Sequence, residues 1–151
     1  MHIKWYGYLL LGALICIVDR ISKMAALMWC AGAAQTITSF LSCQVFFNRG
    51  IAWSFLHSES DSIFIGVSVV IACITAIVGW HAYYQYMRGR LIIGEVCVIA
   101  GSFSNLIDRA VYCGVIDFIV FSYNNFSWPV FNVADAVIVL GVGIMIFQYE
   151  T

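Results

Sequence analysis

The chain has 151 residues, of which 63% are apolar or aromatic and only 10% are charged. Soluble domains carry about 25% charged residues, and disordered chains combine low hydrophobicity with high net charge, so both classes are excluded. The formal net charge of −1 also excludes a typical nucleic-acid binder, which would show a basic patch or stripe. The composition and length indicate an integral membrane protein with a single domain, residues 1–151.

Four segments are apolar and long enough to predict helices that cross a bilayer, which takes about 20 residues each. The clearest lies near residues 62–87, where no Asp, Glu, Lys or Arg occurs from position 63 onward. The others lie near residues 5–26, 91–110 and 129–149. We expect the first helix to be retained rather than cleaved as a signal peptide, because no A-x-A-like site follows it. Pro129, the only proline, suits the first turn of the last helix.

The segment between the first two predicted helices is mixed in character. Residues 40–47 are rich in aromatic and aliphatic side chains, and the turn signal Asn-Arg-Gly follows at 48–50. Residues 51–56 fit a returning strand, and residues 111–128 would lie on the same side of the membrane. The sequence therefore predicts an all-α membrane protein, with four transmembrane helices and a small extramembrane β element near residues 40–56, between helices 1 and 2.

The cysteines and histidines do not predict a metal site. The six cysteines are widely spaced without a C-x-x-C pair, and the three histidines form no H-E-x-x-H motif. No other pattern requires a cofactor. Cys30, Cys43 and Cys113 fall near predicted loops, so a disulfide among these three stays open.

The basic residues do not settle the orientation in the membrane. Lys4, Arg88 and Arg90 lie on one side, and four basic residues lie on the other: Arg20, Lys23, Arg49 and Arg109. This count is nearly balanced. Arg88 and Arg90 stand in a short loop without an adjacent acid, which favours the cytoplasm for that loop and for both termini.

Several charged residues lie inside or beside the predicted helices, where they are energetically expensive. Asp19 and Lys23 are four residues apart, so they share a helix face and can form an ion pair. Ser102, Asn105 and Arg109 lie along one stripe of the third helix, and Asp108 lies beside this stripe, three residues from Asn105. The structural interpretation is that these groups satisfy one another, Asp19 with Lys23 and Asp108 with its neighbours Asn105 and Arg109.

Asp117 and Asp135 have no adjacent basic residue. Asn132 lies three positions before Asp135, on the same helix face. Two carboxylates in one low-dielectric site tend to share a proton, so that one activates water and the other protonates a carbonyl, as in aspartic proteases. A carboxylate pair that moves protons or ions is equally natural within a membrane. Residue spacing alone leaves both interpretations open.

Five sequence blocks resemble the motifs of one family. DRISK at 19–23 is similar to D-x-x-x-K, and FNRGIAWSF at 47–55 is similar to F-N-x-G-x-A-[FW]-S. GSFSNLIDR at 101–109, VIDF at 115–118 and FNVAD at 131–135 are similar to G-N-L-x-D-R, V-[VI]-D-F and F-N-x-A-D. In this order, on four predicted helices, they resemble bacterial lipoprotein signal peptidase (signal peptidase II). The resemblance covers nearly the whole chain.

The resemblance implies an aspartic endopeptidase of the bacterial cytoplasmic (inner) membrane. It would remove signal peptides from diacylglyceryl-modified prolipoproteins, cutting before the lipidated cysteine, and globomycin, which blocks this family, would inhibit it. Asp117 and Asp135 match the catalytic pair. Seven further residues match positions that bind substrate or stabilise the site: Asp19, Lys23, Asn48, Asn105, Asp108, Arg109 and Asn132.

The resemblance also implies partners and topology. The partners would be the lipid-modified prolipoprotein and membrane lipids, without nucleic acid, metal or cofactor, and the enzyme would be a monomer. Both termini would be cytoplasmic, with the active site near the outer face. Three residues depart from the usual pattern: Arg20 stands where glutamine is common, Ile51 where alanine is common, and Ser104 where glycine is common.

Overall fold

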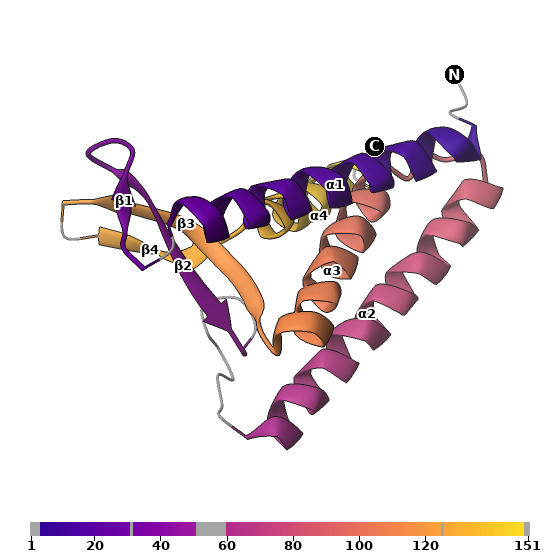
Figure 1. The fold of residues 1–151 in the computed structure, drawn as a ribbon. Helices are drawn as coiled ribbons and strands as arrows, with labels where there is room; N and C mark the ends of the chain where they lie inside the picture. Colours follow the sequence, from indigo (N-terminus) through magenta and orange to yellow (C-terminus); the bar gives the residue numbers. More distant parts are fainter. Residues whose placement is uncertain (1–3, 31, 51–59, 125, 150–151) are drawn as a thin grey trace.

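The computed structural model describes residues 4–30, 32–50, 60–124 and 126–149. These form four helices and one antiparallel sheet (Figure 1). The helices are α1 (Trp5–Trp29), α2 (Asp61–Met87), α3 (Ile93–Tyr112) and α4 (Val133–Tyr149). The strands are β1 (Gln35–Thr36), β2 (Leu41–Asn48), β3 (Val115–Tyr123) and β4 (Phe126–Phe131). The four helices lie close to the predicted positions.

Helix α3 contacts each of the other three helices, and small residues let α4 approach it closely. A Cβ atom added to Gly101 would lie 2.7 Å from Ile138 and 2.8 Å from the carbonyl oxygen of Ala134. A Cβ added to Gly141 would lie 2.7 Å from the carbonyl oxygen of Gly94. Such small-residue contacts are typical of helix pairs in membranes, where close backbone approach replaces the hydrophobic driving force.

The sheet has the strand order β1-β2-β3-β4 and lies at one end of the helices (Figure 1). In β2 and β3, Phe46 pairs with Asp117 and Asn48 pairs with Val115. Helix α3 ends at Cys113, which has a left-handed φ of 54° and turns the chain into β3. This short turn places the polar end of α3 beside the start of β3.

The structure corrects the predicted β element. Half of the sheet, β3 and β4, comes from the segment between α3 and α4 rather than from the one between α1 and α2. Pro129 lies in β4, so the expectation that it opens the last helix is wrong, and α4 begins at Val133. Proline is tolerated there because β4 is an edge strand and needs fewer N–H donors. The strand expected at 51–56 lies outside the described residues.

A disulfide joins Cys30, at the end of α1, to Cys43 in β2. Both cysteines are buried, and Val45 and Phe118 pack against them. Cys113, the third cysteine that the sequence left open, is exposed and unbridged. The bridge ties the first helix covalently to the sheet.

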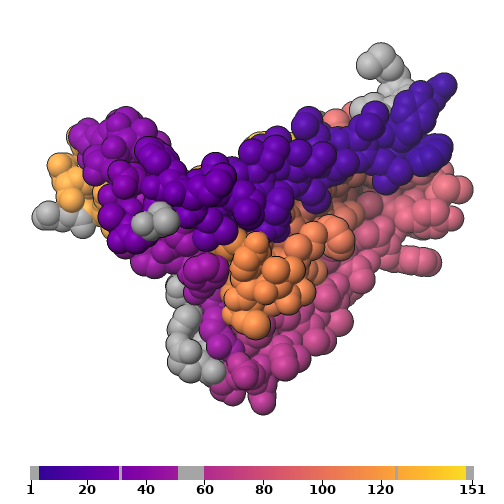
Figure 2. All heavy atoms as spheres, in the orientation of Figure 1, coloured from indigo at the N-terminus to yellow at the C-terminus, as the bar shows by residue number. Residues whose placement is uncertain are grey.

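Large apolar side chains cover the outside of the helices. The exposed fraction is 68% for Leu10 on α1, 67% for Ile77 on α2 and 72% for Phe147 on α4. Figure 2 shows α1 and α2 as the two sides of a wedge. Among the described helices, α2 is the one that is long and apolar enough to cross a membrane: it has 27 residues and contains an 18-residue stretch with a mean hydropathy of 2.5. Four helices are thus confirmed, and four membrane spans stay a prediction.

Candidate active site

Asp117 and Asp135 are linked by Asn132, which is completely buried. The Asn132 side chain donates from Nδ2 to Asp117 Oδ1 at 2.7 Å. Its Oδ1 accepts a hydrogen bond from the Asp135 backbone N–H at 2.9 Å, and its own N–H donates to Asp135 Oδ2 at 3.3 Å. This reciprocal pair is a capping box at the start of α4. The same asparagine therefore starts the helix and holds both carboxylates.

Each aspartate also accepts a hydrogen bond from a second asparagine. Asn48, at the end of β2, donates from Nδ2 to Asp117 Oδ2 at 3.0 Å, and its Oδ1 accepts from the Gly50 N–H at 2.8 Å. Asn105 of α3 donates from Nδ2 to Asp135 Oδ1 at 2.8 Å. Since all of these donors are amides, the two aspartates lie in a polar site without a direct ion pair.

Behind Asn105 lies a buried ion network around Lys23. The Lys23 ammonium lies 2.7 Å from Asp19, 2.7 Å from Asp108 and 2.8 Å from Asn105 Oδ1. The side chains of Lys23, Asp19 and Asp108 are 0% exposed. Three partners satisfy the three donors of an ammonium group, and the pairing of Asp19 with Lys23 is confirmed.

The sequence suggested that Asp108 pairs with Arg109, but in the structure it does not. Its partners are Lys23 and the Arg20 guanidinium, whose Nη1 lies 2.6 Å from Asp108 Oδ1. Arg109 points elsewhere, donating to the carbonyl oxygens of Arg49 and Gly50. It therefore supports the chain segment that follows β2, next to Asn48.

Burial and charge act together on Asp117. Desolvation raises the pKa of this carboxyl to about 7, and the nearby Asp135 carboxylate adds to the shift. Hydrogen bonds from Asn48 and Asn132 and the charge of Lys23 oppose it. An aspartate that keeps its proton until pH 7 can act as an acid at neutral pH.

Both aspartates line a cavity of about 690 Å³. Most of its other lining is apolar and comes from α2, α3, α4 and β4, including Ile74, Val98, Pro129, Val139 and Ile146. The cavity thus joins a polar end at Asp117 and Asp135 to a long apolar wall. In the described part of the chain, no group of three or more His, Cys, Asp or Glu side chains could hold a metal ion.

The family model described as signal peptidase (SPase) II matches residues 11–150. The lipoprotein signal peptidase of Rickettsia conorii (strain ATCC VR-613 / Malish 7) is 37% identical over 142 residues, covering 88% of this chain and 67% of that protein. The lipoprotein signal peptidase of Azoarcus sp. (strain BH72) is 33% identical, covering 93% of this chain and 80% of that protein.

The chain belongs to the signal peptidase II family. A bacterial membrane enzyme solved by the in meso method at 2.3 Å resolution has the same fold, with a TM-score of 0.77 and 24% identity over 99% of this chain and 92% of that one. A second such enzyme, at 1.9 Å, gives a TM-score of 0.75 and 22% identity over 98% of this chain and 95% of that one. The chain is therefore a bacterial membrane protein, as its composition predicts.

All nine residues that the signal peptidase II resemblance singled out meet in one hydrogen-bonded region. Asp117, Asp135 and the three asparagines form its front, and Asp19, Lys23 and Asp108 lie behind. Arg109 closes one side through the Gly50 carbonyl. Their assembly is a finding of the structure, whereas their roles in the reaction are inferred below.

Sequence reasoning missed two members of this region, Arg20 and Ser104. Arg20 Nη2 donates to the Ser104 carbonyl oxygen at 3.3 Å, and Ser104 Oγ donates to Asp19 Oδ2 at 2.6 Å. Both stand where the signal peptidase II pattern has another residue. The sequence does hold one indication of the role of Arg20. It is a second basic residue next to Asp19, and a buried network with two acids needs two basic residues to be electrically neutral.

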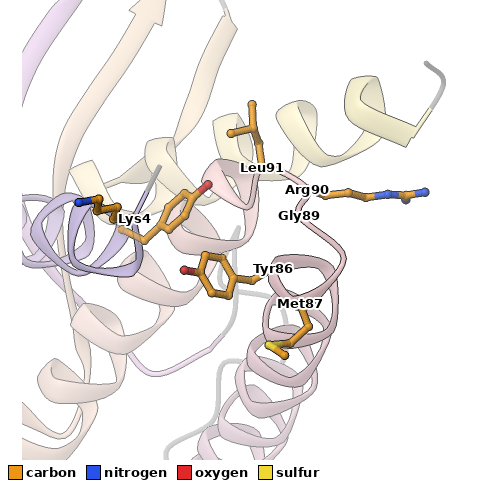
Figure 3. A pocket seen from close by; sticks show the side chains of 7 residues that line it. Lys4, Tyr86, Met87, Gly89, Arg90 and Leu91 are labelled. Atoms are coloured by element: carbon orange, nitrogen blue, oxygen red, sulfur yellow. The ribbon is translucent and has the colours of Figure 1, made fainter. Parts of the chain in front are cut away.

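A second cavity, of about 290 Å³, lies between the start of α1 and the α2–α3 turn, at the end remote from the sheet. Its lining includes Lys4, Tyr86 and Arg90. Figure 3 shows that Lys4 and Arg90 direct their charged groups away from each other. The charged groups of this cavity are therefore not directed at one common position, whereas the two aspartates of the first cavity are held together by Asn132.

Proposed function

We propose that Asp117 and Asp135 are the catalytic pair with which this chain hydrolyses diacylglyceryl-modified prolipoproteins before the lipidated cysteine. As a signal peptidase II, the chain is an aspartic-type protease that removes signal peptides in lipoprotein maturation. The observation that carries the residue assignment is the bridge through Asn132, which holds one oxygen of each carboxylate. Among the described residues, Asp117 and Asp135 are the two acids that line this cavity.

The pair would work with one proton between its two carboxyl groups. The ionised carboxylate takes a proton from a water molecule, whose oxygen attacks the carbonyl carbon of the scissile peptide bond. The protonated carboxyl group gives its proton to the carbonyl oxygen. As the C–N bond breaks, the leaving nitrogen takes up a proton from one carboxyl group of the pair. The tetrahedral diol gives one hydroxyl proton to the other carboxylate and becomes the new carboxylic acid, so the pair again holds one proton. The raised pKa of Asp117, about 7, supports a singly protonated pair at neutral pH.

The apolar wall of the cavity supports a lipid-modified substrate. Ile74, Val139 and Ile146 lie along it, away from the aspartates, and they could contact the acyl chains while the peptide reaches the polar end. A substrate without its lipid would therefore bind much more weakly.

We further propose that the sheet and the active site face the outside of the cytoplasmic membrane, with both termini in the cytoplasm. The Cys30–Cys43 disulfide supports this, because disulfides persist in the periplasm and are rare in the cytosol. Arg88 and Arg90 then lie in a cytoplasmic turn, as basic loop residues usually do. In intact spheroplasts, a membrane-impermeant maleimide should label the exposed Cys113. Labelling only in inverted vesicles would show that Cys113 lies on the cytoplasmic side and would contradict this topology.

A monomeric enzyme is part of the same proposal. Every hydrogen bond described to Asp117 and Asp135 comes from this one chain. No second copy is needed to complete the site. Membrane lipids would surround the exposed apolar faces of α1, α2 and α4.

Purified protein in detergent should cleave a synthetic lipopeptide with a diacylglyceryl cysteine and should not cleave the same peptide without lipid. Globomycin should inhibit the cleavage. Asp117→Asn and Asp135→Asn should each abolish turnover while the protein stays folded. Asp61→Asn is the matched control, because the Asp61 side chain is 86% exposed. A folded Asp117→Asn or Asp135→Asn protein with normal turnover would contradict the catalytic role of the pair. It would favour the alternative interpretation, in which the two carboxylates move protons or ions.

A further inference from the structure

Arg20 connects α1 to the end of α3 through two contacts. Its Nη1 lies 2.6 Å from Asp108 Oδ1, and its Nη2 donates to the Ser104 carbonyl oxygen at 3.3 Å. We propose that Arg20 is a positioning residue of the catalytic pair, which fixes the orientation and the charge of Asp108 and thereby the strand that carries Asp117. This inference rests on the proposed function of Asp117 and Asp135.

The two carboxylate oxygens of Asp108 have different partners, which fixes the orientation of the side chain. Oδ1 accepts from Arg20, while Oδ2 accepts from Lys23 at 2.7 Å and from the backbone N–H of Ile116 at 3.3 Å. Ile116 directly precedes Asp117. By holding Oδ1, the Arg20 guanidinium keeps Oδ2 turned towards the start of β3. A planar guanidinium with two donors engaged fixes a carboxylate better than a single ammonium group does.

Without Arg20, the buried part of the network is not electrically neutral. Asp19, Lys23 and Asp108 are 0% exposed and together carry one excess negative charge. Arg20, whose side chain is 29% exposed, supplies the second positive charge. An uncompensated buried charge is strongly destabilising, so the fourth member makes the network electrically balanced.

An unbalanced network would also change the electrostatic potential at the Asp117 carboxyl group. The charged groups acting on that carboxyl are Asp135 on α4, Lys23 on α1 and Arg109 on α3. Without Arg20, the positive charge of Lys23 would be outweighed by two carboxylates close behind the site. The extra negative charge should raise the pKa of Asp117 further.

Arg20 and Ser104 act together although both depart from the family pattern. The Ser104 carbonyl holds one guanidinium nitrogen, and the Ser104 hydroxyl donates to Asp19 at 2.6 Å. Glutamine in place of Arg20 could still donate to Asp108, but it would bring no charge. The charge balance of this network therefore depends on a positive charge at position 20.

The test compares Arg20→Gln, Arg20→Lys and the double variant Arg20→Gln/Asp108→Asn with the wild type, using lipopeptide cleavage over a range of pH. Arg20→Gln should lower kcat by about tenfold or more, with KM changed much less, and should move the alkaline limb of the pH profile upward. Arg20→Lys keeps the charge, so it should keep the limb and lose less activity. The double variant restores the charge balance and should recover part of the lost kcat.

Arg88→Gln is the control, because it removes one basic residue at the opposite end of the helices. It should leave kcat, KM and the pH profile unchanged. An Arg20→Gln protein with normal kcat and an unmoved alkaline limb would overturn the inference, as would an equal effect of Arg88→Gln. If Arg20→Gln does not fold, Arg20→Lys decides, because an unchanged kcat in that variant would also overturn it.

The inference and the proposed function can fail separately. Cleavage by the wild type that is lost in Asp117→Asn upholds the proposed function whatever Arg20 does. Normal cleavage by folded Asp117→Asn contradicts the proposed function directly.

Discussion

The Asp19 carboxylate accepts a hydrogen bond of 2.8 Å from the backbone N–H of Ala134, the residue that precedes Asp135. Asp108 makes the equivalent contact with Ile116, the residue that precedes Asp117. Lys23 lies between the two carboxylates, 2.7 Å from each. One buried lysine thus connects the backbone segments that carry the two proposed catalytic aspartates.

Replacing Lys23 by alanine should therefore destabilise the protein by about 3–5 kcal/mol, because two buried carboxylates lose their shared partner. Thermal unfolding in detergent measures this loss. Asp61→Asn is the control: it breaks an ion pair with Arg49 in which the aspartate side chain is largely exposed. It should therefore change the stability of the protein little.

A double-mutant cycle tests whether Asp19 and Lys23 act as one unit. Asp19→Ala combined with Lys23→Ala should cost little more stability than the more harmful single substitution. Additive losses would mean that the two residues have separate roles.

Gly101→Ala should displace α4 and lower both stability and cleavage. The added Cβ would lie 2.7 Å from Ile138 and 2.8 Å from the Ala134 carbonyl oxygen, so the helix that carries Asp135 must move. We expect a loss of about 1–3 kcal/mol, as for other overpacked sites. Gly143→Ala on α4 is the matched control, because nothing lies within 4 Å of its added Cβ. Equal stability of the two variants would contradict the close α3–α4 contact.

Reduction of the Cys30–Cys43 bridge should lower the unfolding free energy by about 3 kcal/mol, since it closes a loop with a sequence separation of 13. Cys30→Ser should have the same effect without reductant. Cys113→Ser should have none, because that cysteine is exposed and unbridged. Thermal midpoints of the three proteins, measured with and without reductant, check this. A reductant-insensitive wild type would exclude the bridge.

The sequence predicted the helices and the aspartates better than the sheet. Helix positions follow from local apolar runs, and the capping box of Asn132 and Asp135 is also a local pattern. Strand pairing is a long-range property: Asn48 and Asp117 are 69 positions apart, and no local pattern says that their strands pair. For the same reason, spacing did not select Cys43 as the partner of Cys30. Nor did it show that Asp108 pairs across helices with Lys23 and Arg20 rather than with its neighbour Arg109.

The last prediction concerns the stability of the protein as a function of pH. Burial raises the pKa of Asp117 to about 7 in the folded protein, from the ordinary value of 3.8. Between these two values the unfolded chain has lost this proton while the folded protein still holds it. The unfolded state then binds fewer protons, so the free energy of unfolding falls as the pH rises.

Asp117→Asn removes the titrating group, and the amide can still occupy nearly the same space. The wild type should therefore lose stability relative to Asp117→Asn by up to about 4 kcal/mol as the pH rises from about 4 to about 8. Thermal midpoints of both proteins across this range measure the difference, because titrating groups that do not interact with Asp117 cancel in the comparison. The thermal midpoint of Asp61→Asn should change with pH in parallel with that of the wild type, because the Asp61 side chain is 86% exposed. Parallel curves for the wild type and Asp117→Asn would mean that Asp117 ionises as an ordinary carboxyl group, and it would then lack the proton that the proposed reaction takes from the pair at neutral pH.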